Sequence, residues 1–421
     1  MKLKKYKLGD IAKIEISGVD KKTIEGETPV RLCNFVDVYY NWAITKEKAK
    51  SFMAASAKQT EIDKCSIGKG MVAITKDSET RDDIGVATYI ADDFEDVLLG
   101  YHCALITPNP AIVDGKYLNA FMHTRYIQKY FENNASGSGQ RYTLSNDTIS
   151  NIPVLLPSIE EQHIIGKLLA DLDRKIELNK QINDNLEAMA KQLYDYWFVQ
   201  FDFPNEDGKP YKSSGGAMAW NEKLKRKIPQ GWSNGILSDV ANITMGQSPD
   251  GSSYNEDGEG IIFYQGSTDF GLRFPDIRQY TTSPSRYANK GDILMSVRAP
   301  VGALNIANND CCIGRGLSAL SSKIGSMTHL YYLMNDFRLK FEGMNSAGTT
   351  FGSITKNELF SLPVIIPTKS VISEFEQVCE PIFYKQMIIG EEINALTKQR
   401  DELLPLLMNG QASVNYHLSD D

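Results

Sequence analysis

Apolar residues recur with a period of 3.5 along two long stretches of the chain, one in the middle and one near the C-terminus. Eight of ten positions in this phase are apolar in the first stretch and nine of eleven in the second, where composition alone predicts about five. A period of 3.5 kept over this length is typical of helices that pack along a coiled-coil seam. We therefore predict two long helices, and the first, from Ile159 to Phe198, would extend roughly 60 Å at about 1.5 Å per residue.

The predicted seam between these helices is mostly aliphatic. Its members are Ile165, Leu169, Leu172, Ile176, Leu186 and Leu193 in the first helix and Ile382, Ile389, Ile393, Leu396 and Leu403 in the second. Asn179, Asn183, Gln386 and Arg400 interrupt the pattern; they either fix register and pairing or lie at the solvent edge of the helices. Pro381 lacks an amide donor, so we expect a kink or a short separate helix near residues 370–380.

Three short strings recur in the same order in the two halves of the chain, which indicates an internal duplication. The pairs are Leu8-Gly-Asp-Ile-Ala12 with Leu237-Ser-Asp-Val-Ala241, Lys69-Gly-Met-Val-Ala-Ile-Thr75 with Lys290-Gly-Asp-Ile-Leu-Met-Ser296, and Ile152-Pro-Val-Leu-Leu-Pro157 with Leu362-Pro-Val-Ile-Ile-Pro367. The offset between copies falls from 229 to 210, so the first copy holds 19 more residues, as variable loops on a shared frame would give.

The fold class we predict is α+β, with two similar globular domains separated by two long antiparallel helices packed as a coiled coil. Strands are expected at Gly70–Thr75 and Asp292–Val297, and further helices at Lys116–Asn133 and Thr328–Phe341. The predicted segments are a first domain (1–157), a central helix (158–203), a linker rich in Gly, Ser and Pro (204–229), a second domain (230–368), a C-terminal helix (369–410) and a tail (411–421).

The composition is that of an ordinary globular protein rather than a disordered or fibrous one. The chain has 421 residues, of which 42% are hydrophobic and 23% charged. Its six cysteines include no Cys-x-x-Cys pair, and no apolar run approaches the ~18 residues of a membrane span. We expect a cytoplasmic protein with reduced thiols, neither exported nor embedded in a membrane.

The net charge of −8 by itself argues against nucleic-acid binding, but the distribution of the charge along the sequence removes this objection. Residues 1–150 carry a net charge of 0 and residues 230–368 a net charge of −2, whereas the predicted helices hold most of the acidity. Local basic faces on the two globular segments are therefore permitted.

A search for catalytic chemistry finds little. The sequence has no phosphate-binding loop of the Gly-x-x-x-x-Gly-Lys-Ser/Thr type and no His-Glu-x-x-His zinc helix. Asn109-Pro-Ala-Ile112 is best interpreted as a loop, and His102-Cys103 as a pair in a buried strand whose side chains point to opposite faces. Cys311-Cys312 lacks further ligands at metal-binding spacing and is assigned to the core.

In their order along the chain, several strings together resemble the specificity subunits of type I DNA restriction-modification systems. These are Trp197-Phe-Val-Gln-Phe-Asp-Phe203, Gly208-Lys-Pro-Tyr-Lys-Ser-Ser-Gly-Gly216, Ile228-Pro-Gln-Gly-Trp232, Met245-Gly-Gln-Ser-Pro249 and Gly291-Asp-Ile-Leu294. The resemblance covers nearly the whole chain. The first copy departs from it, with Gly70-Met-Val-Ala73 in place of Gly291-Asp-Ile-Leu294.

The resemblance implies a non-catalytic subunit with two target-recognition domains, each reading one half of a split sequence in double-stranded DNA, with a gap set by the helices. It also implies two methylation subunits, which carry S-adenosylmethionine, and restriction subunits, which carry the ATP- and Mg-dependent motor and nuclease. This chain itself is then expected to bind no cofactor and no metal.

Reading DNA requires donors that reach base edges and cations or amides that contact phosphates. Two loops of small residues, at 136–143 and 346–353, each precede the returning Pro-x-x-x-Pro segment, and arginines or lysines follow the repeated strands. The candidate DNA-contact residues are Lys76, Arg81, Gln140, Arg141, Tyr142, Arg273, Arg278, Arg286, Arg298, Arg315, Thr349 and Thr350, with Tyr264 and Gln265 as weaker ones. The alternative for each of them is an ordinary solvated surface.

Two other functions stay open at this point. The chain could be a structural or assembly protein with two protein-binding globules joined by a coiled coil and no role on DNA. A single-chain restriction or methylation enzyme would require a cofactor or metal motif, and the sequence offers none that we recognise.

Overall fold

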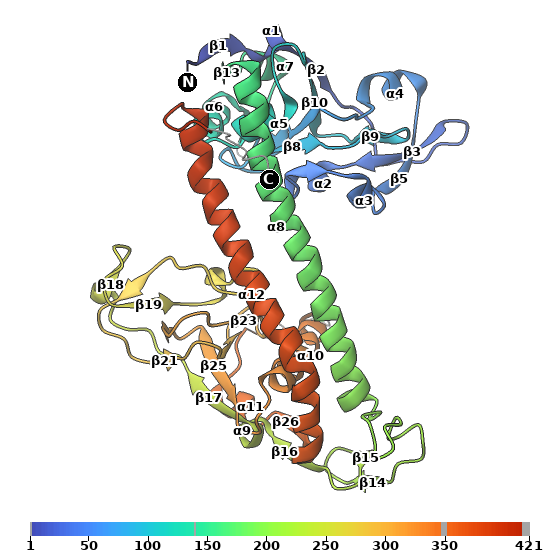
Figure 1. Cartoon of the computed structure of the whole chain (residues 1–421), viewed down its shortest axis with the longest axis vertical. Coiled ribbons are helices and arrows are strands. Elements are labelled where there is room, and N and C mark those ends of the chain that lie inside the picture. Colours follow the sequence, from blue (N-terminus) through green and yellow to red (C-terminus); the bar gives the residue numbers. More distant parts are fainter. Residues whose placement is uncertain (1, 139, 347–351, 415–421) are drawn as a thin grey trace, which may run out of the picture. The chain divides into compact units, whose positions relative to one another are not determined.

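The computed structural model describes residues 2–138, 140–346 and 352–414, and these fall into two compact units (Figure 1). Unit 1 combines residues up to 178 with those from 394 onward, and unit 2 comprises residues 179–393. The two longest helices, α8 (Ile159–Tyr194) and α12 (Lys369–Met408), each contribute one part to each unit.

Unit 1 is built on a five-stranded sheet of order β2-β10-β6-β8-β4, beside smaller sheets of order β5-β3-β9, β11-β12-β7 and β1-β13. Its strands are β1 (Lys4–Lys7), β2 (Ala12–Ile16), β3 (Thr28–Cys33), β4 (Ala43–Ile44), β5 (Met53–Ala57), β6 (Val72–Thr75), β7 (Asp77–Ser78), β8 (Ala87–Ile90), β9 (Val97–Leu99), β10 (Cys103–Pro108), β11 (Ser136–Ser138), β12 (Arg141–Thr143) and β13 (Pro153–Leu156). Its short helices are α1 (Leu8–Ile11), α2 (Phe35–Tyr39), α3 (Lys46–Ala49), α4 (Gln59–Cys65), α5 (Gly115–Met122), α6 (Arg125–Asn134) and α7 (Asn146–Ser150).

Unit 2 repeats part of this plan in a four-stranded sheet of order β17-β25-β22-β23, beside sheets of order β18-β20-β19-β24-β21, β16-β26 and β14-β15. Its strands are β14 (Met218–Asn221), β15 (Arg226–Pro229), β16 (Ser233–Ile236), β17 (Ala241–Met245), β18 (Tyr254–Asn255), β19 (Ile261–Tyr264), β20 (Tyr280–Thr281), β21 (Tyr287–Ala288), β22 (Ile293–Ser296), β23 (Leu304–Ile306), β24 (Cys311–Ile313), β25 (Leu317–Ser322) and β26 (Pro363–Ile366). Its helices are α9 (Leu237–Val240), α10 (Met327–Ser346) and α11 (Lys356–Phe360).

The predicted duplication is present in the fold. The ladder β1-β13 of unit 1 corresponds to β16-β26 of unit 2, and the order β2-β10-β6-β8 corresponds to β17-β25-β22-β23. Helices α1 and α9 coincide with the first repeated string. Gly70 and Gly291 begin the strings that differ between the two copies. Both glycines precede equivalent strands, with φ values of 92° and 93°, so the copies align through this point.

Both long helices bury their predicted seam positions. In unit 1, Ile165 and Leu169 of α8 share one hydrophobic core with Leu404 and Leu407 of α12. In unit 2, the other ends of the same helices meet through a cluster that contains Tyr194, Ile372, Phe375 and Cys379. The early part of α8 therefore packs with the late part of α12, and the reverse holds in unit 2. The two helices are antiparallel.

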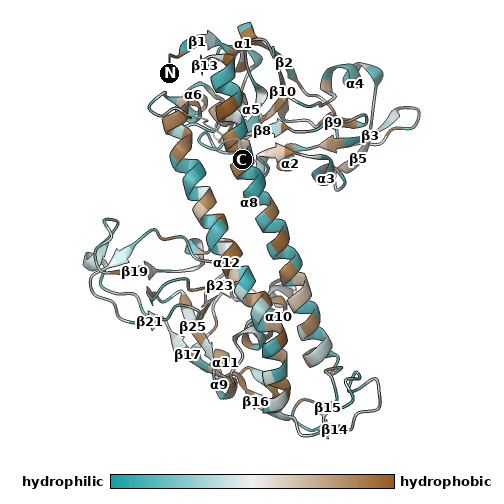
Figure 2. Cartoon of the chain, viewed as in Figure 1, coloured by the Kyte–Doolittle hydropathy of each residue, from teal (hydrophilic) through white to brown (hydrophobic). Residues whose placement is uncertain are grey.

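The remaining seam residues are also buried or half-buried, and Figure 2 shows hydrophobic residues recurring along both helices. The polar residues Asn179, Asn183 and Gln386 are 7%, 7% and 0% exposed, so the solvent-edge alternative is wrong for them. The regular interlocking of a coiled coil stays a prediction.

Two of the predicted helices differ from the structure. Helix α12 runs without interruption through Pro381, so the separate short helix expected near residues 370–380 does not occur, and a kink there stays a prediction. Pro381 has no amide hydrogen to donate to the carbonyl of Gln377. Both residues are exposed, so water can hydrate this carbonyl while the opposite face of the helix stays packed. The helix predicted at Lys116–Asn133 is two helices, because Thr124 caps α6 by accepting a hydrogen bond from the Ile127 amide.

The segment 204–229, predicted as a linker, is folded. It contains the hairpin β14-β15, and Ile228 packs in the same core as Trp197, Phe198 and Trp232 at the end of α8. Apolar residues within a segment rich in Gly and Ser explain why it folds onto this core rather than extending into solvent.

Candidate nucleic-acid interface

In unit 1 the candidate residues lie around the small sheet β11-β12-β7. Asp77 pairs with Thr143 and Ser78 with Tyr142 in an antiparallel ladder, which brings the loop after strand β6 against the loop of small residues. The tight β11-β12 hairpin requires Gly137, where φ is 147° and an added Cβ would lie 2.1 Å from the carbonyl oxygen of Arg141. The small residues predicted from the sequence thus allow close approach of the two strands.

Four ionisable side chains meet at this junction. The imidazole Nδ1 of His102 lies 2.5 Å from Asp77 Oδ2, and the guanidinium Nη2 of Arg141 lies 2.9 Å from His102 Nε2. Lys76 Nζ lies 3.1 Å from the same Asp77 oxygen. Burial acts to raise the pKa of Asp77, but hydrogen bonds from Thr143, His102 and Lys76 outweigh it and lower that pKa below its usual value. Asp77 is therefore an anion at neutral pH.

His102 differs from its sequence-based interpretation. It does not belong to a buried strand, because β10 begins at Cys103 and His102 lies in the preceding turn with φ of 72°. Its side chain is 28% exposed, whereas Cys103 is fully buried, and burial raises the pKa of the Cys103 thiol to about 12. The two residues do not form a nucleophile–base pair.

A cleft of about 640 Å³ opens beside this cluster. Its lining includes aromatic residues of α2 and the residue after this helix: Phe35 and Tyr39 stack with ring centroids 5.7 Å apart, and Tyr40 is 78% exposed. Gln140 and Arg141 also line the cleft. The cleft thus combines donors, acceptors and exposed aromatic surface, which is a mixture suited to the edges and faces of bases.

The other unit 1 candidates lie nearby. The guanidinium of Arg81 lies 5.1 Å from the centre of the Tyr142 ring, a cation–π arrangement that holds an exposed arginine against a half-buried aromatic residue. Lys76 is half-buried by its ion pair with Asp77, and its accessible charge is accordingly reduced. All five unit 1 candidates therefore surround one junction.

In unit 2 three of the candidate arginines come from neighbouring loops. The amide of Ile313 donates to the carbonyl of Arg286, and the amide of Val297 donates to Gly316, next to Arg315. Arg298 forms an isolated bridge with Ser353, which corresponds to the pairing of Asp77 with Thr143 in unit 1. Arg286, Arg298 and Arg315 are exposed, so their guanidiniums are available to a ligand.

The other unit 2 candidates differ from one another in exposure. Arg278 is exposed and lies 3.9 Å from Asp276, whereas Arg273 is 7% exposed and its guanidinium contacts Glu187 and Gln386. Arg273 therefore has a structural role, and we no longer include it among DNA contacts. Tyr264 is fully buried and is likewise a core residue. Thr349 and Thr350 lie outside the described residues.

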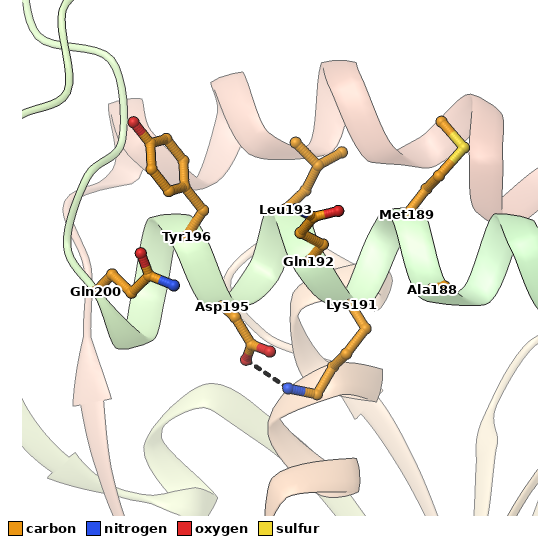
Figure 3. A pocket seen from close by; sticks show the side chains of 8 residues that line it. All are labelled: Ala188, Met189, Lys191, Gln192, Leu193, Asp195, Tyr196 and Gln200. Carbon is orange, nitrogen blue, oxygen red and sulfur yellow. Dashed lines mark hydrogen bonds and ion pairs between the residues drawn. The ribbon is translucent and has the colours of Figure 1, made fainter.

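A second hollow of about 760 Å³ follows the end of α8 in unit 2 (Figure 3). Its lining includes the 52% exposed Met189, together with Tyr196, Gln200 and an ion pair between Lys191 and Asp195. Lys191 also lies 3.3 Å from Asp336. None of the candidate DNA-contact residues lines this hollow, so it is not part of the candidate interface.

Searches for other chemistry return little from the described residues. No group of three or more His, Cys, Asp or Glu side chains within them could hold a metal ion. The six cysteines are buried and unpaired, and burial raises the pKa of Cys311 to about 12. Among the same residues, no helix has the length and apolar character needed to cross a membrane.

Sequence reasoning missed His102, Asp77 and Tyr39 as members of the site. A lone histidine before a strand and an aspartate after one carry no recognisable spacing, since they are 25 residues apart and meet only through tertiary pairing. The positive φ of His102 could not be inferred from the sequence either.

Two copies of one α+β domain, each packed on parts of the same two helices and each with arginine-bearing loops at equivalent places, define a two-domain recognition subunit. The chain belongs to the family of the type I restriction-modification DNA specificity domain, which matches residues 2–188 and 229–399. The two matched regions correspond to the two copies of the internal repeat.

Individual relatives agree with this assignment. A specificity subunit assigned to the type I restriction enzyme MjaX of Methanocaldococcus jannaschii is 31% identical over 76% of this chain and 73% of its own length. The type I restriction enzyme HindI specificity subunit of Haemophilus influenzae is 23% identical over 79% of this chain and 85% of its own. The crystal structure of a type I restriction-modification S subunit from M. genitalium has the same fold, with a TM-score of 0.60, 15% identity and 96% coverage of both chains. The resemblance found in the sequence is confirmed.

Proposed function

We propose that this chain binds double-stranded DNA sequence-specifically and that each of its two domains reads one half of a bipartite target. The observation that carries the proposal is the repetition of one loop pair. The loops at Asp77 and Thr143 in unit 1, and at Arg298 and Ser353 in unit 2, occupy equivalent places in the duplicated fold and lie beside exposed arginines. Duplicated heads with different loop side chains suit two different half-sites.

We further propose that the chain has no catalytic activity and works in the cytoplasm with two methylation subunits and with restriction subunits. S-adenosylmethionine, ATP and Mg would act on those partners, and this chain would bind no cofactor. The protonated, buried thiols of Cys103 and Cys311 support the absence of a nucleophile. Incubation of the isolated chain with labelled S-adenosylmethionine and DNA should give no transfer, and addition of a methylation subunit should give methylated adenine.

The decisive experiment maps the methylated adenines produced by the chain together with its methylation subunit. A target in two parts with an unspecified gap is expected, and a continuous target would contradict the two-domain reading. Exchange of the second domain for that of a relative should change one half of the target and leave the other unchanged.

The alternative function, a protein-binding assembly subunit without a role on DNA, makes a different prediction. Binding of the full chain to a duplex should weaken steeply as salt increases, because lysines and arginines that contact phosphates displace counterions. Binding that is absent or independent of salt would favour the alternative.

A further inference from the structure

Arg141 is held at one side of its guanidinium by a series of hydrogen-bonded side chains that begins in the interior of unit 1. The side chain of Asp77 is 9% exposed, that of His102 28% and that of Arg141 56%, so this series of side chains leads from the interior to the surface. The three residues come from three separate segments, namely β7, the turn before β10, and β12. Their meeting is a product of the tertiary fold.

Which of these side chains donates and which accepts a hydrogen bond follows from the donor capacity of arginine. A guanidinium can only donate, so the imidazole nitrogen that faces Arg141 must accept. Arg141 Nη2 contacts both ring nitrogens, lying 2.9 Å from Nε2 and closer to Nδ1, and Nδ1 also lies 2.5 Å from Asp77 Oδ2. The Asp77 carboxylate can only accept, so we assign the proton to Nδ1 and the acceptor role toward Arg141 to Nε2. Asp77 then fixes the orientation of the His102 imidazole.

The backbone at His102 adds a second, independent observation. Its φ of 72° belongs to the left-handed region, which costs folding stability for any residue with a side chain. Glycine would adopt this conformation at lower cost. The histidine at this position is therefore better explained by the contacts of its imidazole than by the backbone conformation of the turn.

The surroundings favour a base edge over a phosphate as the ligand of Arg141. Asp77, Glu79 and Asp83 all line the cleft, and Asp83 accepts a hydrogen bond from Tyr39 at 2.8 Å. Three carboxylates repel a phosphate. Arg141 lines the cleft, and its side-chain hydrogen bonds within the described chain use Nη2, which leaves the other donors of its guanidinium for a ligand.

We propose that Arg141 is a specificity-determining residue that recognises guanine through O6 and N7, and that His102 and Asp77 are positioning residues that orient its guanidinium. Arginine paired with these two acceptors is the commonest specific contact in the major groove. Pre-orientation by His102 lowers the entropy lost when the long side chain binds. This inference rests on the proposed DNA-binding function and identifies one base that unit 1 reads.

The test selects bound duplexes from a random pool with the full chain and measures base preference at each position. Arg141→Ala should lower the preference for guanine at one position of one half-site by about 5- to 150-fold and leave the other half-site unchanged. Arg125→Ala removes an equally charged, exposed residue of the same domain, which lies near Glu132, and should change neither half-site.

His102→Gly separates positioning from folding. It removes the imidazole at a backbone position that glycine favours, so the thermal midpoint should be unchanged or higher while the same guanine preference falls. His102→Asn tolerates the left-handed conformation and supplies one donor and one acceptor, so it should restore part of the preference. A merely structural role of His102 would predict no difference between the glycine and asparagine variants.

Two negative outcomes are distinguishable. If the wild-type chain selects no sequence at all, the proposed function fails. If it selects a two-part target and His102→Gly leaves the guanine preference intact, the function stands and the positioning role of His102 is wrong.

Discussion

The guanidinium of Arg273 lies 3.3 Å from the carboxylate of Glu187 on α8, and its second amino group donates to Gln386 of α12 at 3.2 Å. Gln386 in turn donates to Glu187 at 2.7 Å. The rings of Tyr331 and Phe383 enclose the same guanidinium at 5.3 and 5.0 Å. One loop residue of the second domain thus connects both long helices within unit 2.

Replacement of Arg273 should therefore destabilise unit 2. Arg273→Met keeps much of the volume but leaves Glu187 and Gln386 without their cationic partner. A loss of about 1.5–3 kcal/mol in the free energy of unfolding is expected, because the half-buried Glu187, whose side chain is 34% exposed, and the buried Gln386 lose hydrogen bonds to a charged group. Urea unfolding followed by tryptophan fluorescence measures it. Arg278→Met, at an exposed arginine 3.9 Å from Asp276, should change stability by less than about 0.5 kcal/mol.

A related contact stabilises unit 1. The guanidinium of Arg400 on α12 lies 5.1 Å from the centre of the Trp42 ring and 3.4 Å from Asp173 of α8. Arg400→Lys keeps the charge but loses the planar group that stacks on the indole, so we expect a loss of about 1 kcal/mol and a change in Trp42 fluorescence. Lys398→Arg, at an exposed neighbour, is the control. Equal effects of the two substitutions would argue against stacking.

Acid should weaken the fold through His329. Burial lowers its pKa from 6.5 to about 3, and its ring contacts Phe198 with centroids 4.5 Å apart. The unfolded chain takes up this proton near pH 6.5 and the folded chain does not, so stability is complete above that pH and falls as the pH decreases toward 3. The loss between pH 7 and 5 should be about 2 kcal/mol.

His329→Phe should remove this part of the acid sensitivity, as measured by urea unfolding at several pH values. His163→Gln, at a position where the side chain is 59% exposed, should leave the acid loss as it is in the wild type. A pH profile that His329→Phe does not change would show that other groups cause the loss.

Arg315 should affect only the half-site read by the second domain. Arg315→Ala is expected to relax the preference at one base pair by roughly 1 to 3 kcal/mol if the arginine reads a base. A contact with phosphate would instead weaken binding to all sequences and reduce the salt slope by about one. Lys290→Ala, at a lysine 3.6 Å from Glu391 of α12, provides the matched control.

Much of the architecture could be predicted from the sequence because it depends on local and periodic features. The 3.5-residue period of α8 and α12 follows from burial of one helix face, and burial of Leu169, Ile389 and Ile393 agrees with the predicted phase. The repeated strings fixed the equivalence of the two domains. The short separate helix expected before Pro381 was wrong because propensity is a local quantity, whereas packing of Cys379 and Ile389 stabilises the helix on its other face.

The composition of the candidate site was only partly accessible in this way. Arg141 and Gln140 stand out in a loop of small residues, so their selection required no structure. That Arg273 is buried, that Arg286 and Arg315 belong to neighbouring loops, and that His102 holds Arg141 could not be inferred, since each depends on contacts between distant segments.

The sequence by itself determined the repeat, the two long helices and the family, because periodic burial and short recurring strings are written into neighbouring residues. The tertiary structure alone decided which charged side chains stay available to a ligand and which are used to join helices. Charge is a property of a residue, but its availability depends on the partners that the fold brings within hydrogen-bonding distance.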